Sequence, residues 1–514
     1  MNLLTMEHVS KAYTDRVLLD DVGFGINENE KIGVIGINGM GKSTLLKVVA
    51  GIEESDAGTI SMGNQVKICY LPQTPVFEEG TTILRAATEG NYDELNRWTI
   101  EAEAKSMLNQ LGFTDYDEKV EHMSGGQKKR VALVRALLTP ADILVLDEPT
   151  NHLDNEMSEW LEEYLIQFRG AILMVTHDRY FLDRVVNRIV EVDHGKLYNY
   201  PGNYSEFVRL KAERQNMELA TERKRKSLLR TELEWLYRGA RARSTKQKAH
   251  IDRIHAMQEM EDIQEEKRVL LDSVASRMGN KTIELSGICK SYGEKKLIED
   301  FSYIFLKKDR IGIIGHNGCG KSTLLKIING IVKPDAGTIE IGQTIKIGYF
   351  SQENEYMDES LRVIDYVKEA GEYIATSDGK ITASQMLERF LFDGAMQWSR
   401  IEKLSGGEKR RLYLLRVLME APNVLILDEP TNDLDIQTLT ILEDYLDHFD
   451  GIILIVSHDR YFLDRTVNRI FAFEGDGKLR QSEGGYSDYL IRVELEKPND
   501  GQTDAGNGAG TVSG

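Results

Sequence analysis

The sequence has little cysteine, and none of it is arranged in pairs. Among 514 residues there are three cysteines, Cys69, Cys289 and Cys319, and no Cys-x-x-Cys spacing. An odd and scattered set disfavours a disulfide scaffold and a structural zinc site, and it fits a reducing compartment. We therefore expect a cytoplasmic protein.

Long apolar runs are also missing. Gly451–Val456 (GIILIV) is among the strongest, and it is of strand size, whereas a helix that spans a bilayer needs about 18 residues or more. The N-terminal stretch MNLLTMEHVSKAY lacks the apolar core of a signal peptide. Both absences predict a chain with no integral membrane domain.

Positive charge is in deficit. The chain has 64 basic and 83 acidic residues, a net charge of −19. This excludes a protein that coats nucleic acid over its whole surface, but it leaves room for a local basic module. At about 100–200 residues per domain, the length predicts more than one domain, most simply two large ones with connectors.

What the sequence does contain is a long internal repeat. GINGMGKST begins at Gly36 and recurs as GHNGCGKST from Gly315, 279 residues later. Three further segments recur 281 residues apart, namely SGGQ with SGGE, LDEPTNHLD with LDEPTNDLD, and THDRYFLDR with SHDRYFLDR. A period of about 280 residues is too long for a solenoid and predicts two fused copies of one domain.

Each copy has the pattern of an α/β domain. Short apolar, β-branched runs lead into the Gly-rich segments, and the Ser-Thr-Leu-Leu-Lys that follows starts a helix. Strands that alternate with helices imply a largely parallel sheet. The predicted buried strands are Ile32–Ile35, Ile143–Leu146, Ala171–Val175, Ile311–Ile314, Val424–Leu427 and Ile452–Val456.

A different kind of sequence lies between the copies. Ser205–Arg238 has no glycine or proline, is densely charged, and repeats leucine and methionine at broadly helical spacing. It predicts a helix about 50 Å long, which Gly239 separates from a second helix through about Met260. The linker is thus expected to be a helical hairpin. After Pro498 the Gly-rich, acidic composition is typical of a disordered tail.

The Gly-rich segments have the spacing of a phosphate-binding loop, GxxxxGK(S/T). Glycines let backbone N–H groups close around phosphate oxygens, and the N-terminus of the next helix adds to the positive field. The lysines would contact the β- and γ-phosphates, and the serines would ligate Mg²⁺. The loop residues predicted to bind nucleotide are Gly36, Asn38, Gly39, Gly41, Lys42, Ser43, Thr44, Gly315, Asn317, Gly318, Gly320, Lys321, Ser322 and Thr323.

An Asp-Glu pair ends one apolar strand of each copy, and a histidine follows another. The aspartate can reach the Mg²⁺ shell, the glutamate can orient or deprotonate the attacking water, and a neutral histidine could hydrogen bond to the γ-phosphate. The predicted catalytic residues are Glu148, Glu429, His177 and His458. The predicted metal ligands are Ser43, Gln73, Asp147, Ser322, Gln352 and Asp428.

Three further features recur in both copies. A glutamine offers its amide to Mg²⁺ or to the water, and a tyrosine could stack on adenine, although a core tyrosine would show the same pattern. Ser-Gly-Gly opens a helix whose N–H groups form a second anion site, which is expected to serve the nucleotide of the other copy. These residues are Tyr13, Gln73, Ser124, Gly125, Gly126, Tyr292, Gln352, Ser405, Gly406 and Gly407.

The order of these motifs, present twice, resembles that of the ATP-binding cassette (ABC) ATPases over residues 1 to about 200 and 282 to about 492. Two cassettes in one chain with a charged helical linker resemble the ABC-F family, of which LDEPTNHLD and HDRYFLDR are typical. The resemblance implies an ATPase that uses ATP and Mg²⁺, and a monomer whose two cassettes pair within the chain.

The implied fold is α/β, with two tandem P-loop ABC ATPase domains joined by a long α-helical hairpin linker. We place the first cassette at 1–204, the linker at 205–280, the second cassette at 281–495 and a disordered tail at 496–514.

The resemblance also implies that the linker meets tRNA and rRNA on the ribosome. Arg223–Lys248 has ten basic and two acidic residues, a net charge of +8, and Trp235 and Tyr237 offer stacking faces. A solvated spacer is the alternative interpretation. The residues predicted to bind nucleic acid are Arg238, Arg241, Arg243, Lys246 and Lys248.

Within that family the wording ELEWLYRGARAR is most similar to the Uup branch. Two features depart from it. The stretch between Gln73 and Ser124 is no longer than its counterpart in the second copy, so a large inserted arm is not expected. The long C-terminal coiled coil of that branch is absent, so DNA is a weaker candidate partner.

Four functions therefore compete. The favoured one is a translation factor that couples ATP to the position of the linker on the ribosome. A ribosome-protection factor for antibiotic resistance would have the same architecture. A DNA-associated ATPase of the Uup kind and the ATPase subunit of a transporter are the others, the last being the least favoured because it needs separate membrane partners.

Overall fold

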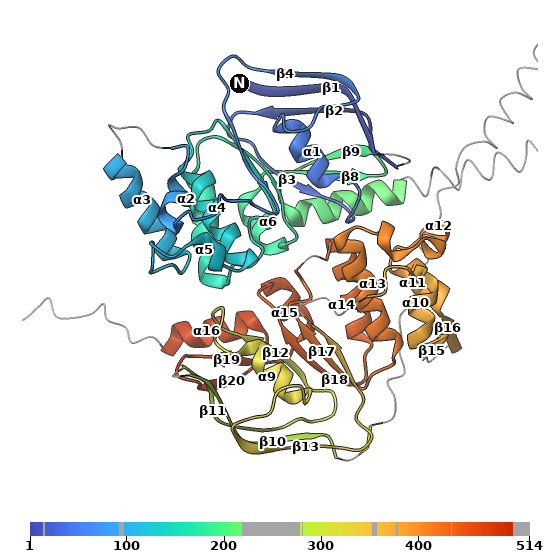
Figure 1. Cartoon of the computed structure of the whole chain (residues 1–514). Helices are drawn as coiled ribbons and strands as arrows, with labels where there is room; N and C mark the ends of the chain where they lie inside the picture. Colours follow the sequence, from blue (N-terminus) through green and yellow to red (C-terminus); the bar gives the residue numbers. More distant parts are fainter. Residues whose placement is uncertain are drawn as a thin grey trace, which may run out of the picture. The chain divides into compact units, whose positions relative to one another are not determined.

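The computed structural model describes residues 1–13, 16–91, 97–217, 221, 278–279, 281–293, 295–351, 357–376, 379–432 and 434–496. These residues form two compact units (Figure 1). The first comprises the described residues of Met1–Asn151 and Ser158–Leu271. The second comprises those of His152–Met157 and Asp272–Gly514.

Two sheets build the first unit. A three-stranded antiparallel sheet has the order β2-β1-β4, with β1 (Asn2–Tyr13), β2 (Arg16–Asn27) and β4 (Ala57–Met62). A six-stranded sheet has the order β5-β6-β7-β3-β8-β9, with β3 (Lys31–Ile35), β5 (Ile68–Leu71), β6 (Ile143–Asp147), β7 (Ala171–Val175), β8 (Arg188–Asp193) and β9 (Lys196–Pro201). Strand β9 runs antiparallel to β8, and the other neighbours pair in parallel.

Helix α1 (Lys42–Val49) lies between the two sheets (Figure 1). Residues alternate between the faces of a strand, so Ile32 and Val34 of β3 share a core with Leu45 of α1. Gly33 belongs to the opposite face, where a Cβ atom would come within 2.6 Å of Leu182 Cδ2. The glycine therefore lets the helix that carries Leu182 pack closely on the strand that leads into the phosphate loop.

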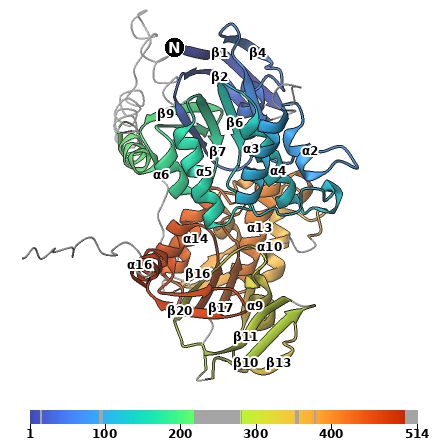
Figure 2. The same cartoon turned by 90° about the vertical axis from the view of Figure 1, so that its left-hand side faces the viewer.

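That second face is covered by α5 (Asn155–Gln167) and α6 (Arg179–Val185), which lie near β7 in Figure 2. The HDRYFLDR segment explains the position of α6. Asp178 caps the helix by accepting a hydrogen bond from the Phe181 amide, and Phe181 and Leu182 are fully buried. Arg184 donates to the buried Glu162 carboxylate of α5 at 2.8 Å, which joins the two helices.

Three helices, α2 (Ile83–Thr88), α3 (Arg97–Gln110) and α4 (Gly125–Leu138), pack on one another beside this layered core (Figure 1). A 3-10 turn, Val120–His122, leads into α4. After β9 the chain is helical again over residues 204–217. This last helix is the beginning of the predicted linker.

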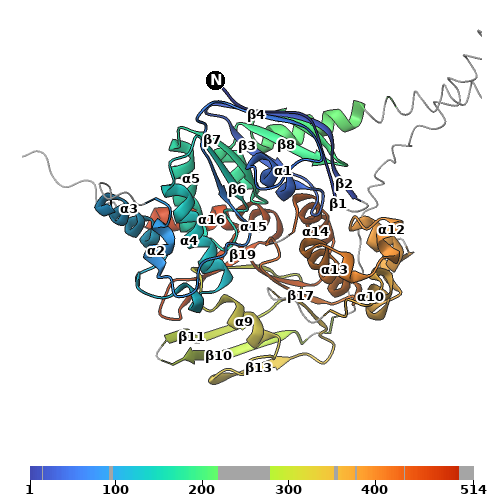
Figure 3. The ribbon, with the colours of Figure 1, turned by 45° about the horizontal axis from the view of Figure 1, so that its top comes forward.

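The second unit repeats the plan. Its antiparallel sheet, order β11-β10-β13, contains β10 (Ile283–Tyr292), β11 (Lys295–Ile304) and β13 (Ala336–Ile341). Its six-stranded sheet, order β14-β17-β18-β12-β19-β20, contains β12 (Arg310–Ile314), β14 (Ile347–Phe350), β17 (Val424–Asp428), β18 (Ile452–Val456), β19 (Arg469–Phe473) and β20 (Leu479–Glu483). Helix α9 (Lys321–Ile328) lies next to the antiparallel sheet in Figure 3.

The remaining elements of this unit include a small hairpin. They are α10 (Val363–Ala370), β15 (Tyr373–Thr376), β16 (Gly379–Thr382), α11 (Ala383–Arg389), α12 (Gly394–Trp398), the 3-10 turn Ile401–Lys403, α13 (Gly406–Met419), α14 (Ile436–Asp447), α15 (Arg460–Thr466) and α16 (Tyr486–Glu496). Asp459 caps α15, and Arg465 donates to the buried Glu443 at 2.9 Å, as the matching residues do in the first unit.

The predicted fold class is confirmed, and the six predicted buried strands are present with bounds that differ by at most one residue at an end. The antiparallel sheets were not predicted. Of the predicted linker, residues 205–217 are helical, and most of the rest, including the hairpin tip, lies outside the described residues. The tail from residue 497 also lies outside them, and the segment boundaries stay predictions.

Candidate nucleotide-binding sites

Each phosphate loop depends on glycines that no other residue could replace without strain. Gly41 and Gly320, which precede α1 and α9, have φ angles of 98° and 118°, in the left-handed region that favours glycine. A Cβ atom on Gly41 would lie 3.0 Å from the Leu18 Cβ atom, and one on Gly36 would lie 2.4 Å from the Val192 carbonyl oxygen. The backbone therefore closes into a tight cradle at the carboxyl end of β3.

A buried lysine starts the helix after each loop and reaches back over it. The Lys42 ammonium donates to the Gly36 carbonyl at 2.7 Å and to the Asn38 side chain at 3.0 Å. The Lys321 ammonium donates to the Gly315 carbonyl at 2.7 Å and lies 3.1 Å from Nε2 of His458. Each charge is thus held at the place where the phosphate oxygens of a bound nucleotide would need it.

The strand-end aspartates are buried next to the serines of the loops. Ser322 Oγ donates to Asp428 at 3.1 Å, and Tyr349 donates to its other oxygen at 3.3 Å. Burial raises the pKa of both Asp147 and Asp428, while hydrogen bonds from Ser43 and Ser322 act in the opposite direction. Among the described residues, Asp147 Oδ1 has no hydrogen-bond partner. A buried, unsatisfied carboxylate oxygen beside a serine hydroxyl fits Mg²⁺, which prefers oxygen ligands.

The adjacent glutamates have an unusual backbone. Glu148 and Glu429 have φ angles of 53° and 49°, in a region that non-glycine residues rarely occupy. Their amides still donate to the neighbouring strands, at Val175 (2.8 Å) and Val456 (2.9 Å). Such strain persists where the surrounding structure fixes it, typically at functional sites. The turn directs each carboxylate away from the strand axis and toward the histidine of its own unit.

Each glutamate meets the predicted histidine. His177 Nε2 lies 3.5 Å from Glu148 Oε1, and Asn151 donates to the other oxygen of that glutamate. His458 Nε2 lies 3.3 Å from Glu429 Oε1. Among the described residues, Oε2 of Glu429 is buried without a hydrogen-bond partner. An attacking water could occupy such a position, because one carboxylate oxygen remains available to accept its proton.

Burial drives the second pair toward its neutral forms. It raises the pKa of Glu429 from 4.5 to about 7, with Lys321 acting against the shift and Asp428 adding to it. Burial also holds the pKa of His458 well below its ordinary value, with further lowering by Lys321 and His316. The two side chains therefore share a hydrogen bond rather than a full ion pair near neutral pH. A glutamate of this pKa is poised to exchange a proton with water.

The raised pKa of Glu429 predicts a pH-dependent gain in stability for Glu429→Gln. The folded wild type keeps a proton that the unfolded chain releases between pH 4.5 and about 7, so the wild type loses stability as pH rises through that window. Glutamine cannot release a proton, and His458 is common to both proteins. We expect the free-energy advantage of the variant to grow by about 2 kcal/mol between about pH 5 and about pH 8.

Thermal unfolding at the two pH values measures this prediction. For a unit of this size, about 2 kcal/mol corresponds to roughly 4–8 °C in the unfolding midpoint. A difference between variant and wild type that is constant with pH would contradict the raised pKa.

The predicted adenine-stacking tyrosines are exposed rather than in the core. The side chains of Tyr13 and Tyr292 are 45% and 54% accessible, which leaves a ring face open to a base. The Tyr13 hydroxyl donates to Glu53, and it also interacts with Thr44 of the phosphate-loop helix, so the ring lies close to the loop. Gln73 is exposed, and Gln352 lies outside the described residues. Stacking and metal ligation by these residues stay predictions.

The Ser-Gly-Gly segments begin α4 and α13, as predicted. Ser124 and Gln127 form a capping box, in which each side chain accepts a hydrogen bond from the backbone amide of the other. Ser405 and Glu408 do the same on α13. These caps are built entirely from their own helix, so they explain the recurring tripeptide locally. Their proposed service to the nucleotide of the other cassette stays a prediction.

Sequence reasoning missed a pair of hydroxyls beside each glutamate. Thr150 lies 2.8 Å from Thr176, and Thr431 lies 3.0 Å from Ser457, oxygen to oxygen. Each bond ties the turn after the Asp-Glu pair to the residue before the histidine. The signal was present in the repeat, because both members recur 281 residues apart in LDEPT and in THDR or SHDR.

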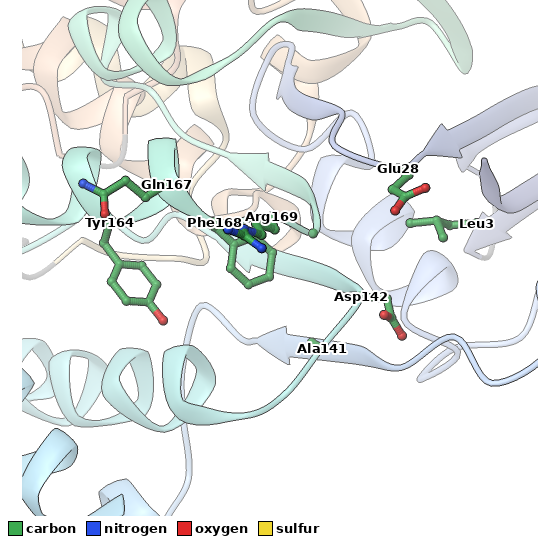
Figure 4. Close-up of a pocket in the computed structure, with 9 residues that line it drawn as sticks. Leu3, Glu28, Ala141, Asp142, Tyr164, Gln167, Phe168 and Arg169 are labelled. Atoms are coloured by element: carbon green, nitrogen blue, oxygen red, sulfur yellow. The ribbon is translucent and has the colours of Figure 1, made fainter. Parts of the chain in front are cut away.

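A cavity of about 600 Å³ in the first unit lies elsewhere. Figure 4 shows its lining, in which Ala141 and Asp142 precede β6, and Phe168 and Arg169 precede β7. The cavity is therefore at the amino ends of the parallel strands. The phosphate loop follows the carboxyl end of β3, and parallel α/β sheets bind their ligands at that end. The cavity is not part of the nucleotide site.

Each unit thus combines a phosphate loop, a strand-end Asp-Glu pair and a histidine on a mixed α/β core. This arrangement defines a nucleoside triphosphatase with two homologous catalytic domains. Comparison with known proteins identifies the family. A family model described as ABC transporter matches residues 19–151 and 298–432, and a second model with the same description matches residues 190–272. The chain belongs to the ABC-F family of ATP-binding cassette ATPases, and it binds and hydrolyses ATP.

Relatives match along nearly the whole chain. The uncharacterized ABC transporter ATP-binding protein YfmR of Bacillus subtilis (strain 168) is 48% identical over 534 aligned residues, covering 97% of this chain and 85% of the relative. The energy-dependent translational throttle protein EttA of Escherichia coli (strain K12) is 36% identical and covers 94% of each chain. The same-named protein of Haemophilus influenzae is 37% identical. The similarity to the Uup branch stays a prediction.

Solved structures share the twin-cassette fold. The archaeal ribosome recycling factor aABCE1, in complex with the stalk protein aP1, aligns with a TM-score of 0.64 over 95% of this chain and 92% of its own. At 20% sequence identity this likeness concerns the fold alone.

Proposed function

We propose that this chain is a cytoplasmic ATP-driven translation factor that acts on the ribosome. ATP binding and hydrolysis at the cassettes would position the basic linker near tRNA and rRNA. The observation that carries the proposal is the stretch of net charge +8 inserted between the two cassettes of a chain of net charge −19. The relatives named as translational throttle proteins, 36–37% identical along the chain, support the same assignment.

The proposed chemistry follows from the site geometry. In each cassette the loop amides and the buried lysine would hold the phosphates, and the serine, the glutamine and the strand-end aspartate would hold Mg²⁺. The metal supplies charge neutralisation between the β- and γ-phosphates when it is bound. The strained glutamate would orient the attacking water and accept its proton, and the histidine beside it would donate a hydrogen bond to the γ-phosphate.

In the second cassette this assignment has a pH consequence. Glu429 can accept a proton only in its ionised form, and its pKa of about 7 makes that form scarce in mildly acidic solution. Lys321 stabilises the ionised form, since it lies next to both residues of the pair. Bound phosphates and Mg²⁺ would alter that balance, which places the control of the base within the nucleotide site itself.

The competing functions rest on weaker observations. A ribosome-protection factor shares every feature above and differs only in the action of the linker tip. A DNA-associated ATPase would use the same basic stretch. A transporter subunit would need membrane partners, and within the part of the chain that the structure describes no helix is long and apolar enough to cross a membrane.

Co-sedimentation with ribosomes tests the proposal. The Glu148→Gln/Glu429→Gln variant, which is expected to retain ATP, should pellet with ribosomes in ATP and remain in the supernatant without nucleotide. An equal molar amount of duplex DNA serves as the competing partner. Absence of ribosome binding, or binding that DNA abolishes, would overturn the translation assignment. A drug-susceptibility assay in cells that express the chain then separates a translation factor from a resistance factor.

A further inference from the structure

A buried carboxylate joins the first cassette to the beginning of its linker. Glu191 lies on β8 with 2% of its side chain exposed. Three groups converge on it. The Tyr200 hydroxyl of β9 donates to Oε2 at 3.0 Å, Arg214 donates to the same oxygen at 3.1 Å, and Lys211 donates to Oε1. Two of the three donors belong to helical residues 204–217, so this carboxylate holds the helix.

The same helix also packs on β9 through aromatic contacts. The buried Phe207 ring meets the Tyr200 ring edge to face, with centroids 5.0 Å apart. The Arg214 guanidinium lies 3.8 Å from the centre of the Tyr198 ring. In Figure 1 this helix, drawn in green, runs along β8 and β9 on the face of the sheet opposite α1. Glu191 thus has a polar joint surrounded by packed rings, which keeps water away from it.

Glu191 is also adjacent to the phosphate loop. In the register of β3 with β8, Glu191 pairs with Ile35, the last residue before Gly36. Gly36 lies so close to β8 that a Cβ atom on it would be 2.4 Å from the Val192 carbonyl oxygen. The Gly36 carbonyl accepts a hydrogen bond from Lys42. A short path therefore leads from the nucleotide-binding lysine through the loop and β8 to the linker helix.

The second cassette lacks this joint. The residue that pairs with Ile314, and so corresponds to Glu191, is Ala472. The helix that follows its last strand, α16, is tied instead through Arg492, which donates to Ser482 of β20 at 3.0 Å. No buried acid faces the helix at the position that touches the phosphate-loop strand. The two cassettes therefore differ at this point even though their loops are nearly identical.

We propose that Glu191 is a positioning residue that couples nucleotide binding at the first phosphate loop to the order of linker residues 204–217. The proposal rests on the proposed function in one respect, that the linker responds to ATP, and it names the joint and the responsible cassette. Phosphate oxygens compete with the Gly36 carbonyl for the Lys42 ammonium, so binding changes the contacts of the residue packed against β8. The carboxylate transmits that change because it is bound to the sheet and to the helix at once.

Hydrogen–deuterium exchange of the full-length protein without ribosomes tests the joint. The amides of residues 204–217 are followed with and without saturating β,γ-imido-ATP and Mg²⁺, with saturation verified separately for each variant. In the wild type we expect the analogue to change their exchange rate by about fivefold or more, and in Glu191→Gln by less than about twofold. The readout is the ratio with and without nucleotide, which a purely structural weakening of the helix would leave intact.

Matched variants complete the test. Glu213→Gln removes the same charge from an exposed pair on the same helix and should respond like the wild type. Lys211→Gln/Arg214→Gln should lose the response as Glu191→Gln does, and it serves if Glu191→Gln fails to fold. Lys42→Ala, which disables the first loop, should abolish the response, and Lys321→Ala should keep it. A response that persists in Glu191→Gln, or that follows Lys321 instead of Lys42, overturns the proposal.

Failure of the joint is distinguishable from failure of the proposed function. A chain that binds ribosomes in ATP but shows no nucleotide response at 204–217 refutes the joint and retains the translation assignment. A chain that shows the response but never binds ribosomes retains the joint and refutes that assignment.

Discussion

Glu148→Gln/Glu429→Gln is expected to lower steady-state ATP turnover by about 100-fold or more while leaving ATP binding intact. The physical reason is that each carboxylate ends a strand in a strained turn beside a histidine, where an ionised oxygen can take the proton of the attacking water. Glutamine keeps the size and one oxygen, but it cannot accept that proton. Phosphate release measured under saturating ATP checks the rate, and filter binding of labelled ATP checks the affinity.

Glu213→Gln/Glu299→Gln is the control for that variant. It also removes one glutamate charge from each unit, at side chains that are 48% and 44% exposed in surface ion pairs. Such pairs contribute little to stability, so turnover should remain near wild type. The single variants would show how the two sites share the work. Unchanged turnover in the Glu148/Glu429 double variant would remove these glutamates from the mechanism.

The second large effect is expected in the linker. Replacing Arg238, Arg241, Arg243, Lys246 and Lys248 with glutamine keeps chain length and helix propensity and removes five charges. If these residues meet RNA phosphates, each lost contact removes a counterion-release contribution. Ribosome binding in ATP should then weaken, and the slope of log affinity against log salt should shrink by about 0.7–0.9 per contact, or at most about four. Ribosome binding across a salt series measures both quantities.

ATP turnover without ribosomes is the internal control for the linker variant. The cassettes lie outside the substituted segment, so turnover should stay near wild type. A solvated spacer would respond differently, because neutralising it would change helix stability by only a few tenths of a kcal/mol. An unchanged affinity together with an unchanged salt slope would therefore identify the linker tip as a spacer and remove the main sequence support for a translation factor.

Much of the fold could be predicted because its signals are local. The strand before each phosphate loop, the loop and the first turn of α1 or α9 occupy about a dozen consecutive residues, and the glycines there are required by backbone geometry. The repeat then doubled every signal, so that a motif found in one copy could be checked in the other. The antiparallel sheets could not be predicted in this way, because β1, β2 and β4 pair through bulged registers with no distinctive turn between them.

The candidate site shows the same division. Residue types and order predicted the lysine, the aspartate, the glutamate and the histidine of each copy. The charge state of Glu429 was not predictable, because its pKa depends on burial and on Lys321 and Asp428, which are distant in sequence or shielded by the fold. The hydroxyl pair Thr150 and Thr176 likewise appears only when β6 and β7 are placed side by side.

Sequence alone determined the membership of two ATPase domains, the identity of their phosphate loops and the location of the basic stretch, because each depends on residues close together in the chain. Only the tertiary structure decided which residues answer one another across strands. Glu191 is a single acid in an apolar strand, and its counterpart is Ala472. Its role as the anchor of Lys211 and Arg214 follows from the register that sets it beside Ile35 and under the linker helix. Register is a property of paired strands, and no single strand carries it.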